Sequence, residues 1–212
     1  MSKHGGSNKI CAVVFDVYGT IAHINDKRSP FAGLLALGQQ RGRPKTDEDA
    51  RTLMGHSLGL RDAAALLQID LETGELEKLE RDLGREVESV TLYPDAVPVI
   101  RALQARGIKI ALCSNLAAPY ASPIKALLPM PLDYYGWSFE LGLIKPDRRI
   151  YEHVCDALAC APHKVLMVGD TRTADVDGPS AIGMQSMLLD RRTTRSTPHV
   201  LHSLEPLIDL VQ

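Results

Sequence analysis

An apolar run that ends in an aspartate, Ala12-Val13-Val14-Phe15-Asp16-Val17-Tyr18-Gly19-Thr20, lies close to the N-terminus. Four consecutive apolar residues, two of them valines, predict a buried strand of a parallel sheet. In open α/β sheets, ligands bind at the carboxyl ends of the strands. Burial of the Asp16 carboxylate at that edge is unfavourable unless a partner group compensates it. We therefore expect Asp16 to be a nucleophile or a metal ligand, the alternative being a cap on the following turn.

Three further segments place polar residues after apolar runs. Lys109–Asn115 is a second predicted strand, which ends in Ser114-Asn115, and Lys164–Asp170 is a third, followed by Asp175. Between them, Lys145 precedes a proline that favours an extended backbone. Each residue also has a purely structural interpretation, because hydroxyls, amides and acids cap helices and lysines usually lie on the surface.

Taken in order, these segments resemble the four motifs of the haloacid dehalogenase-like (HAD) hydrolase superfamily: DxxGT, S/T-N, K-P and GDxxxxD. The resemblance extends from Ala12 to about Met184. It implies an α/β fold, a Rossmann-like three-layer α/β/α sandwich with a parallel sheet, together with a small all-helical cap domain. It also implies a hydrolase that uses an aspartate nucleophile.

The spacing of apolar residues supports two regions of different character. Between Ile21 and Val90, apolar residues recur at helical intervals, as in Leu76, Leu79, Leu83 and Val87. From Leu92 onward, strands and helices alternate, which predicts parallel strands joined by right-handed crossovers. We expect a core domain formed by residues 1–21 and 92–212, a helical cap domain formed by residues 22–91, and a closing helix over residues 201–211.

The resemblance assigns a role to each candidate site residue. Asp16 is the expected nucleophile, assisted by Ser114 and Lys145, while Thr20 and Asn115 are expected to bind the substrate's anionic oxygens. Several carboxylates cannot all stay ionised around an anionic substrate without a cation. We therefore predict Mg²⁺, a hard ion that prefers oxygen ligands. The expected metal-site residues are Asp16, the backbone carbonyl of Tyr18, Asp170 and Asp175.

Tyr18 and motif four favour different members of the family. HAD phosphatases usually have a second aspartate, the general acid/base, two positions after the nucleophile, and this chain has Tyr18 there. The Asp-x-Tyr-Gly-Thr form resembles the 2-haloacid dehalogenases, whose halide leaves without a proton. Motif four has Asp170, the metal-ligand form, and Arg172 stands where those dehalogenases have asparagine. Dehalogenases also need an arginine for the substrate carboxylate, and the candidates are Arg28, Arg41 and Arg43.

We give more weight to the acids, because Asp170 beside Asp16 without a metal would repel an anionic haloacid. The predicted function is a Mg²⁺-dependent phosphohydrolase acting on a small phosphorylated metabolite. Without a second carboxylate, substrates with good leaving groups are expected to react best, and His56 or Glu48 are the candidates if another group supplies a proton. The alternatives are a metal-independent 2-haloacid dehalogenase and a catalytically weak HAD-fold binding or regulatory protein.

Composition supports a globular protein without general affinity for nucleic acid or membrane. The 212 residues include 24 basic and 26 acidic ones, for a net charge of −2, and no apolar run approaches the roughly 18 residues of a membrane span. Residues Met1–Lys9 are polar and do not resemble a signal peptide, so we expect a cytoplasmic protein. No CxxC pair occurs among the four cysteines, and we expect these thiols to be reduced. The expected partner is a small anionic substrate, and the expected assembly is a monomer or homodimer.

Overall fold

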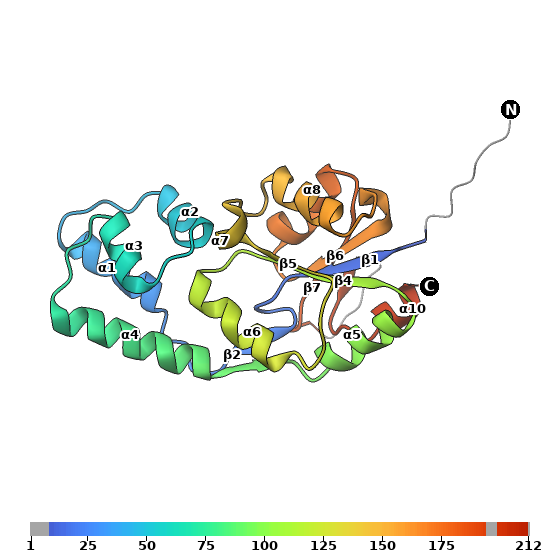
Figure 1. The fold of residues 1–212 in the computed structure, drawn as a ribbon, viewed down its shortest axis with the longest axis horizontal. Helices are drawn as coiled ribbons and strands as arrows, with labels where there is room; N and C mark the ends of the chain where they lie inside the picture. Colours follow the sequence, from blue (N-terminus) through green and yellow to red (C-terminus); the bar gives the residue numbers. More distant parts are fainter. Residues whose placement is uncertain (1–8, 194–198, 212) are drawn as a thin grey trace, which may run out of the picture.

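The structure, a computed structural model, describes residues 9–193 and 199–211 (Figure 1). The prediction about the polar segment Met1–Lys9 therefore lies almost wholly outside the described residues. A six-stranded sheet has the order β5-β4-β1-β6-β7-β8, with every neighbouring pair parallel. Its strands are β1 (Ala12–Phe15), β4 (Lys109–Ser114), β5 (Tyr134–Trp137), β6 (Val165–Gly169), β7 (Gln185–Leu189) and β8 (Val200–Leu201).

Helices cover both faces of this sheet. Val13 and Phe15 of β1 pack into a cluster with α5 (Ala96–Ala105), α6 (Ala121–Leu127) and α10 (Leu207–Leu210). Ala12 and Val14, on the other face, pack with α8 (Arg148–Ala157) and the segment around α9 (Gly178–Ala181). All four β1 residues are buried, as the continuous apolar run predicts for a central parallel strand. The predicted three-layer α/β/α fold is confirmed.

Short turns complete this unit. They are η1 (Ala118–Tyr120), α7 (Ser138–Leu141), η2 (Pro162–Lys164) and the π-helical turn η3 (Arg172–Asp177). The closing helix predicted over residues 201–211 is wrong in extent. Val200 and Leu201 instead extend the sheet beside β7, and only α10 is helical. The buried Leu204 and Leu207 have helical spacing, but that spacing does not reveal that β7 has a free edge to pair.

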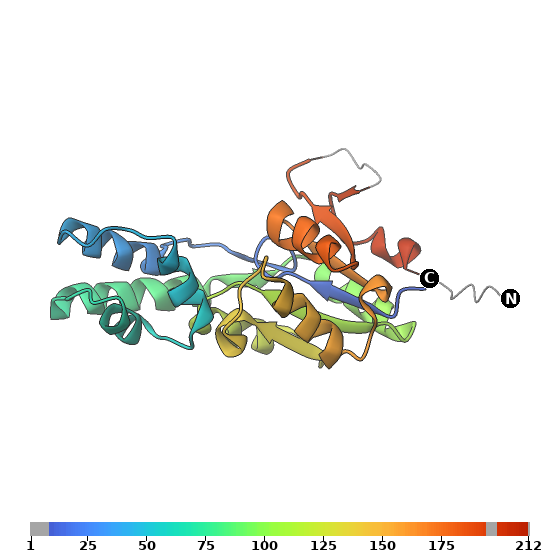
Figure 2. The same ribbon diagram turned by 90° about the horizontal axis from the view of Figure 1, so that it is seen from above.

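A separate helical unit is inserted in the sequence between two short strands, and it lies at one end of the molecule, beside the unit that contains the sheet (Figures 1 and 2). Its helices are α1 (Pro30–Gln40), α2 (Glu48–Gly55), α3 (Leu60–Leu66) and α4 (Thr73–Glu88). They share an apolar core that includes Leu34, Leu53 and Leu79. The strands β2 (Ala22–Ile24) and β3 (Val90–Leu92) form an antiparallel ribbon where the chain enters and leaves this unit. No strand was predicted there, because three residues are too few to show a period of two.

The helices of the described ranges, residues 9–193 and 199–211, do not include one that is long and apolar enough to cross a membrane.

The expectation of reduced cysteines is wrong for one pair. Cys11, just before β1, and Cys160, in the loop after α8, form a disulfide, while Cys113 and Cys155 are free and buried. The paired residues are 149 positions apart, so no local spacing in the sequence indicates that the fold brings them together.

The loop between α1 and α2 is fixed by one buried ion pair. Asp49, which is 2% exposed, accepts hydrogen bonds from Arg43 Nη2 at 2.6 Å and Thr46 Oγ1 at 2.8 Å. Arg43 Nε also donates to the carbonyl oxygen of Leu67 at 2.8 Å, which joins this loop to the end of α3. The Arg43 guanidinium holds the pKa of Asp49 well below its usual range.

We predict that Asp49→Asn lowers the free energy of unfolding at pH 7 by about 2–3 kcal/mol, because Arg43 loses a buried partner. Since the pKa of Asp49 is depressed in the folded state, its contribution is complete above the unfolded pKa, near 4. It declines as the pH falls below that value and is lost as the pH falls through the lower folded pKa. Urea unfolding from pH 7 to pH 3 measures both effects. The exposed Asp47→Asn is the control, and equal stability of the two variants at pH 7 would contradict the prediction.

Candidate active site

The carboxyl ends of three neighbouring strands bring the predicted residues together. Asp16 follows β1, Ser114 ends β4 and Asp170 follows β6, and β1 pairs with both of the other strands. Lys145 lies between α7 and α8 and reaches the same edge. These side chains line a cavity of about 170 Å³ whose remaining residues are Tyr18, Asn115, Thr171, Ala174 and Asp175.

The ammonium of Lys145 joins two carboxylates. Its Nζ donates to Asp16 Oδ1 at 2.8 Å and to Asp175 Oδ1 at 2.6 Å, and Lys145 is only 4% exposed. Burial alone would lower the pKa of Lys145, but the charges of Asp16 and Asp175 outweigh it and raise the pKa above its usual value. Lys145 therefore remains charged and holds Asp16 in place. Ser114 Oγ adds a hydrogen bond to the same Asp16 oxygen at 3.1 Å.

Asp175 anchors the other side of the site. While its Oδ1 accepts from Lys145, its Oδ2 accepts from the backbone N–H of Thr171 at 2.9 Å. Asp175 is fully buried, and burial raises its pKa while Lys145 opposes that rise. Gly169 allows this close packing, since a Cβ atom there would overlap the Asp175 carboxylate. Both Asp175 oxygens are thus already used to position Lys145 and the turn after β6.

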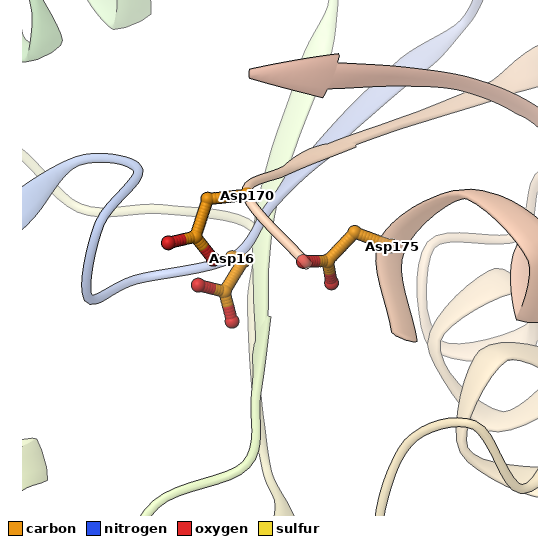
Figure 3. A group of neighbouring side chains, drawn as sticks. All are labelled: Asp16, Asp170 and Asp175. Carbon is orange, nitrogen blue, oxygen red and sulfur yellow. The ribbon is translucent and has the colours of Figure 1, made fainter. Parts of the chain in front are cut away.

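Asp170 adds a further negative charge to the site. Among the residues that the structure describes, no lysine, arginine or histidine forms an ion pair with it. Figure 3 shows its carboxylate beside that of Asp16, with Asp175 reaching toward them from η3. One oxygen of each of the three lies within 4.8 Å of the others. Asp170 is exposed on one side, but loss of solvent around its carboxylate and the charge of Asp16 raise its pKa. Clustered carboxylate oxygens with one ammonium between them match the ligand preference of a hard divalent cation.

The chain approaches Asp170 closely at Gly19. This residue has φ +90°, and a Cβ atom on it would overlap the Asp170 carboxylate. The backbone of the loop after Asp16 can therefore pass beside Asp170 only with glycine at this position.

The Tyr18 side chain lies against Tyr120, in the segment after β4. Its hydroxyl donates to the carbonyl oxygen of Tyr120 at 2.8 Å, and the two rings meet edge to face, with centroids 5.9 Å apart. Burial and, to a lesser extent, the charge of Glu86 raise the pKa of Tyr18. The hydroxyl is therefore protonated and already committed as a donor. It does not replace the carboxylate that HAD phosphatases usually have here.

The two predicted substrate-binding residues have different surroundings. Thr20 is fully buried, its hydroxyl has no hydrogen-bond partner among the described residues, and it does not line the cavity around Asp16. Asn115 does line that cavity, but its amide exchanges hydrogen bonds with the backbone of Lys145, at 2.8 Å to the carbonyl oxygen and 2.7 Å from the N–H. Direct substrate contacts by these residues remain predictions.

Other candidates from the sequence lie elsewhere. Arg28 pairs with Asp26, Arg41 with Glu75 and Arg43 with Asp49, and the cavity around Asp16 is lined by none of these arginines. His56 and Glu48 line a different cavity, against the loop before α8. Sequence reasoning missed the backbone N–H of Thr171, which has no residue-type signal, and the buried Glu86. Helical spacing could have indicated the burial of Glu86, because it follows Leu79 by seven residues on the apolar face of α4.

The model of the haloacid dehalogenase-like hydrolases matches residues 10–183, which include every residue of the cavity around Asp16. The chain belongs to this family. The four motifs on which the resemblance was based are thus those of a HAD-like hydrolase, with Asp16, Ser114 and Asp170 at strand ends and Lys145 in the loop between α7 and α8.

Relatives of this hydrolase have two kinds of activity. The (S)-2-haloacid dehalogenase 1 of Pseudomonas sp. (strain CBS-3) is 31% identical over 196 residues, 86% of this chain and 85% of that protein. A phosphoglycolate phosphatase of Rhodospirillum rubrum is 27% identical over 200 residues, 84% of this chain and 78% of that protein. A crystal structure of a dehalogenase with an intermediate complex superposes with a TM-score of 0.67 at 25% identity, covering 96% of this chain and 97% of the other. These similarities leave the substrate class open.

We predict that Gly19→Ala lowers activity at least tenfold, because Asp170 must move away from Asp16, and costs about 1–3 kcal/mol of stability through strain at positive φ. Gly84→Ala is the matched control, since Gly84 lies in α4 with open space around its Cβ position. That control is expected to gain about 0.5–1 kcal/mol. Activity assays and urea unfolding compare the two, and unchanged activity in Gly19→Ala would contradict this close approach.

Proposed function

We propose that this HAD-like hydrolase is a Mg²⁺-dependent phosphohydrolase acting on a small phosphorylated metabolite, with Asp16 as the nucleophile. The observation that carries the proposal is the Asp170 carboxylate beside Asp16, without a cationic partner in the described residues, where Lys145 is shared between Asp16 and Asp175. This excess of negative charge opposes an anionic substrate unless a further cation binds.

The groups that would hold Mg²⁺ are Asp16, Asp170 and the backbone carbonyl of Tyr18. The Tyr18 carbonyl accepts no hydrogen bond from the described residues, and a backbone oxygen does not require a particular side chain. Asp175 would support the site indirectly, because its oxygens already bind Lys145 and Thr171. When bound, Mg²⁺ would offset the charge of the substrate's phosphoryl group.

The contacts of Asp16 suit a nucleophile. Its Oδ1 accepts from Ser114 and Lys145, while Oδ2 accepts no hydrogen bond from the described residues. Oδ2 would attack phosphorus, forming the aspartyl phosphate as the bond to the leaving oxygen breaks. Water would then attack phosphorus and displace the Asp16 carboxylate, which releases inorganic phosphate. Lys145 and Ser114 would hold the carboxylate in line throughout.

In this proposal, residues 22–91 act as a cap over a core formed by residues 1–21 and 92–212. Contacts that join the two parts support it: Ser138 Oγ donates to the Met54 carbonyl oxygen at 2.6 Å, and Tyr120 Oη donates to Glu86 Oε2 at 3.0 Å. A cytoplasmic location and a monomeric or homodimeric state stay predictions.

A metal-independent 2-haloacid dehalogenase is the second candidate. Tyr18 favours it, since a halide needs no proton on leaving, and the Pseudomonas relative has a dehalogenase name. Against it, the three candidate arginines already form ion pairs: Arg28 in the loop after β2, and Arg41 and Arg43 within the helical unit. The cavity around Asp16 is lined by none of them. Chloride release from 2-chloropropionate in EDTA would favour this candidate.

We predict that calorimetry detects Mg²⁺ binding to the wild-type protein and that Asp170→Asn weakens it roughly tenfold or more, because a neutral amide replaces a charged ligand. Asp177→Asn is the control, since Asp177 is exposed in the same turn and outside the carboxylate cluster. Equal Mg²⁺ affinity in wild type and Asp170→Asn would contradict the proposed metal site.

We also predict that the wild-type enzyme hydrolyses aryl or acyl phosphates in preference to alkyl phosphates, because no carboxylate at position 18 protonates an alkoxide. Tyr18→Asp should raise kcat/KM for alkyl phosphates by about 10- to 100-fold and for aryl phosphates by less. Tyr18→Phe, which removes only the hydroxyl bound to Tyr120, is the control. Turnover of an alkyl phosphate by the wild type at about 10 per second would show that another group supplies the proton.

A further inference from the structure

A second, larger cavity adjoins the one around Asp16. It has a volume of about 600 Å³ and lies between α1 and α2 of the helical unit and the segment after β4. Tyr18 and Asn115 line both cavities, so a group bound in the larger one would extend from a phosphoryl group at Asp16. Much of its wall is apolar, formed by side chains that include Phe31, Leu35, Leu53 and Met54.

One buried carboxylate lies in this wall. Glu86, near the end of α4, is 2% exposed and lines the cavity. Its Oε2 accepts two hydrogen bonds, from the Ser29 N–H at 3.1 Å and from the Tyr120 hydroxyl at 3.0 Å. Its Oε1 accepts none from the described residues, and no lysine or arginine among them forms an ion pair with Glu86.

The other charged groups of the wall do not share this situation. Asp49 is also buried, but Arg43 neutralises it. Lys27, Lys45 and Asp47 line the cavity as exposed residues. Burial raises the pKa of Tyr18 and also that of Tyr120, and the nearby Glu86 carboxylate adds to both shifts. A buried carboxylate that lacks a cation is unfavourable, and a cationic ligand would relieve that penalty.

We propose that Glu86 determines leaving-group specificity by binding, through Oε1, the ammonium of a substrate whose body is apolar. The inference rests on the proposed function, with the phosphoryl group at Asp16 and the ammonium-bearing leaving group in the larger cavity. The substrate class is then a phosphate ester of an aminoalkyl-substituted phenol, whose ring supplies the apolar body and whose alkylamine is protonated.

A purely structural role would also use Glu86, since its hydrogen bonds join the start of α1 to η1 across the helical unit and the sheet unit. That role involves Oε2 and leaves Oε1 unexplained. Glu86→Gln separates the two roles, because the amide oxygen of glutamine still accepts from Ser29 and Tyr120 while the charge is lost.

The test compares 4-(2-aminoethyl)phenyl phosphate with 4-ethylphenyl phosphate in the presence of Mg²⁺. The wild type is expected to favour the ammonium ester by about tenfold in kcat/KM, mainly through a lower KM, as expected for a charge-assisted contact. In Glu86→Gln the ratio should fall to about one, again through KM. Glu88→Gln, at an exposed position of the same helix, should keep the wild-type ratio. A wild-type ratio near one, or an unchanged ratio in Glu86→Gln, would overturn the proposal.

A binding measurement keeps this inference separate from the proposed function. If neither aryl phosphate is hydrolysed with Mg²⁺, the phosphohydrolase proposal fails. Glu86 is then tested with the two corresponding phenols, without phosphate. Calorimetry with 4-(2-aminoethyl)phenol and 4-ethylphenol should show tighter binding of the amine to wild type and equal binding to Glu86→Gln. Equal binding of the two phenols to the wild type, or binding of neither, would overturn the proposed binding of an ammonium by Glu86.

Discussion

The buried ammonium of Lys145 holds the candidate site together. Its two ion pairs, with Asp16 and Asp175, join the end of β1 to the turn after β6, and Asn115 fixes its backbone from the end of β4. A lysine that is 4% exposed would be strongly unfavourable without these carboxylates, and each carboxylate would be unfavourable without the lysine. The three groups therefore depend on one another, and the positions of the surrounding loops follow from their pairing.

That pairing leaves the site with more carboxylates than cations. Lys145 is shared by Asp16 and Asp175, and Asp170 lies beside them without a cationic partner in the described part of the chain. The backbone tolerates this crowding at two glycines, Gly19 against Asp170 and Gly169 against Asp175. Because proteins rarely bring like charges so close without a further cation or a shared proton, this arrangement is the basis of the metal-dependent chemistry that we propose.

The sheet and its strand ends could be predicted from the sequence because buried parallel strands give continuous apolar runs. The residues Asp16, Ser114 and Asp170 followed from the position of those runs, and the structure brings them to one cavity together with Lys145. What the sequence could not show depends on contacts between distant segments. The antiparallel ribbon of β2 and β3, the pairing of β8 with β7 and the Cys11–Cys160 disulfide are of this kind. The direction of the Tyr18 side chain likewise depends on its contact with Tyr120, 102 positions away, and the burial of Glu86 depends on how the helical unit packs against the sheet unit.

The central claim is that the oxygen of Asp16 forms the covalent bond to the substrate's phosphorus. It is tested most directly by rapid acid quenching of the wild-type enzyme during turnover of an aryl phosphate with Mg²⁺, followed by peptide mass spectrometry. We predict that the peptide containing Asp16 gains the mass of one phosphoryl group and that fragmentation assigns this group to Asp16. Phosphorylation of a different residue, or turnover with every quenched sample unmodified at Asp16, would contradict it.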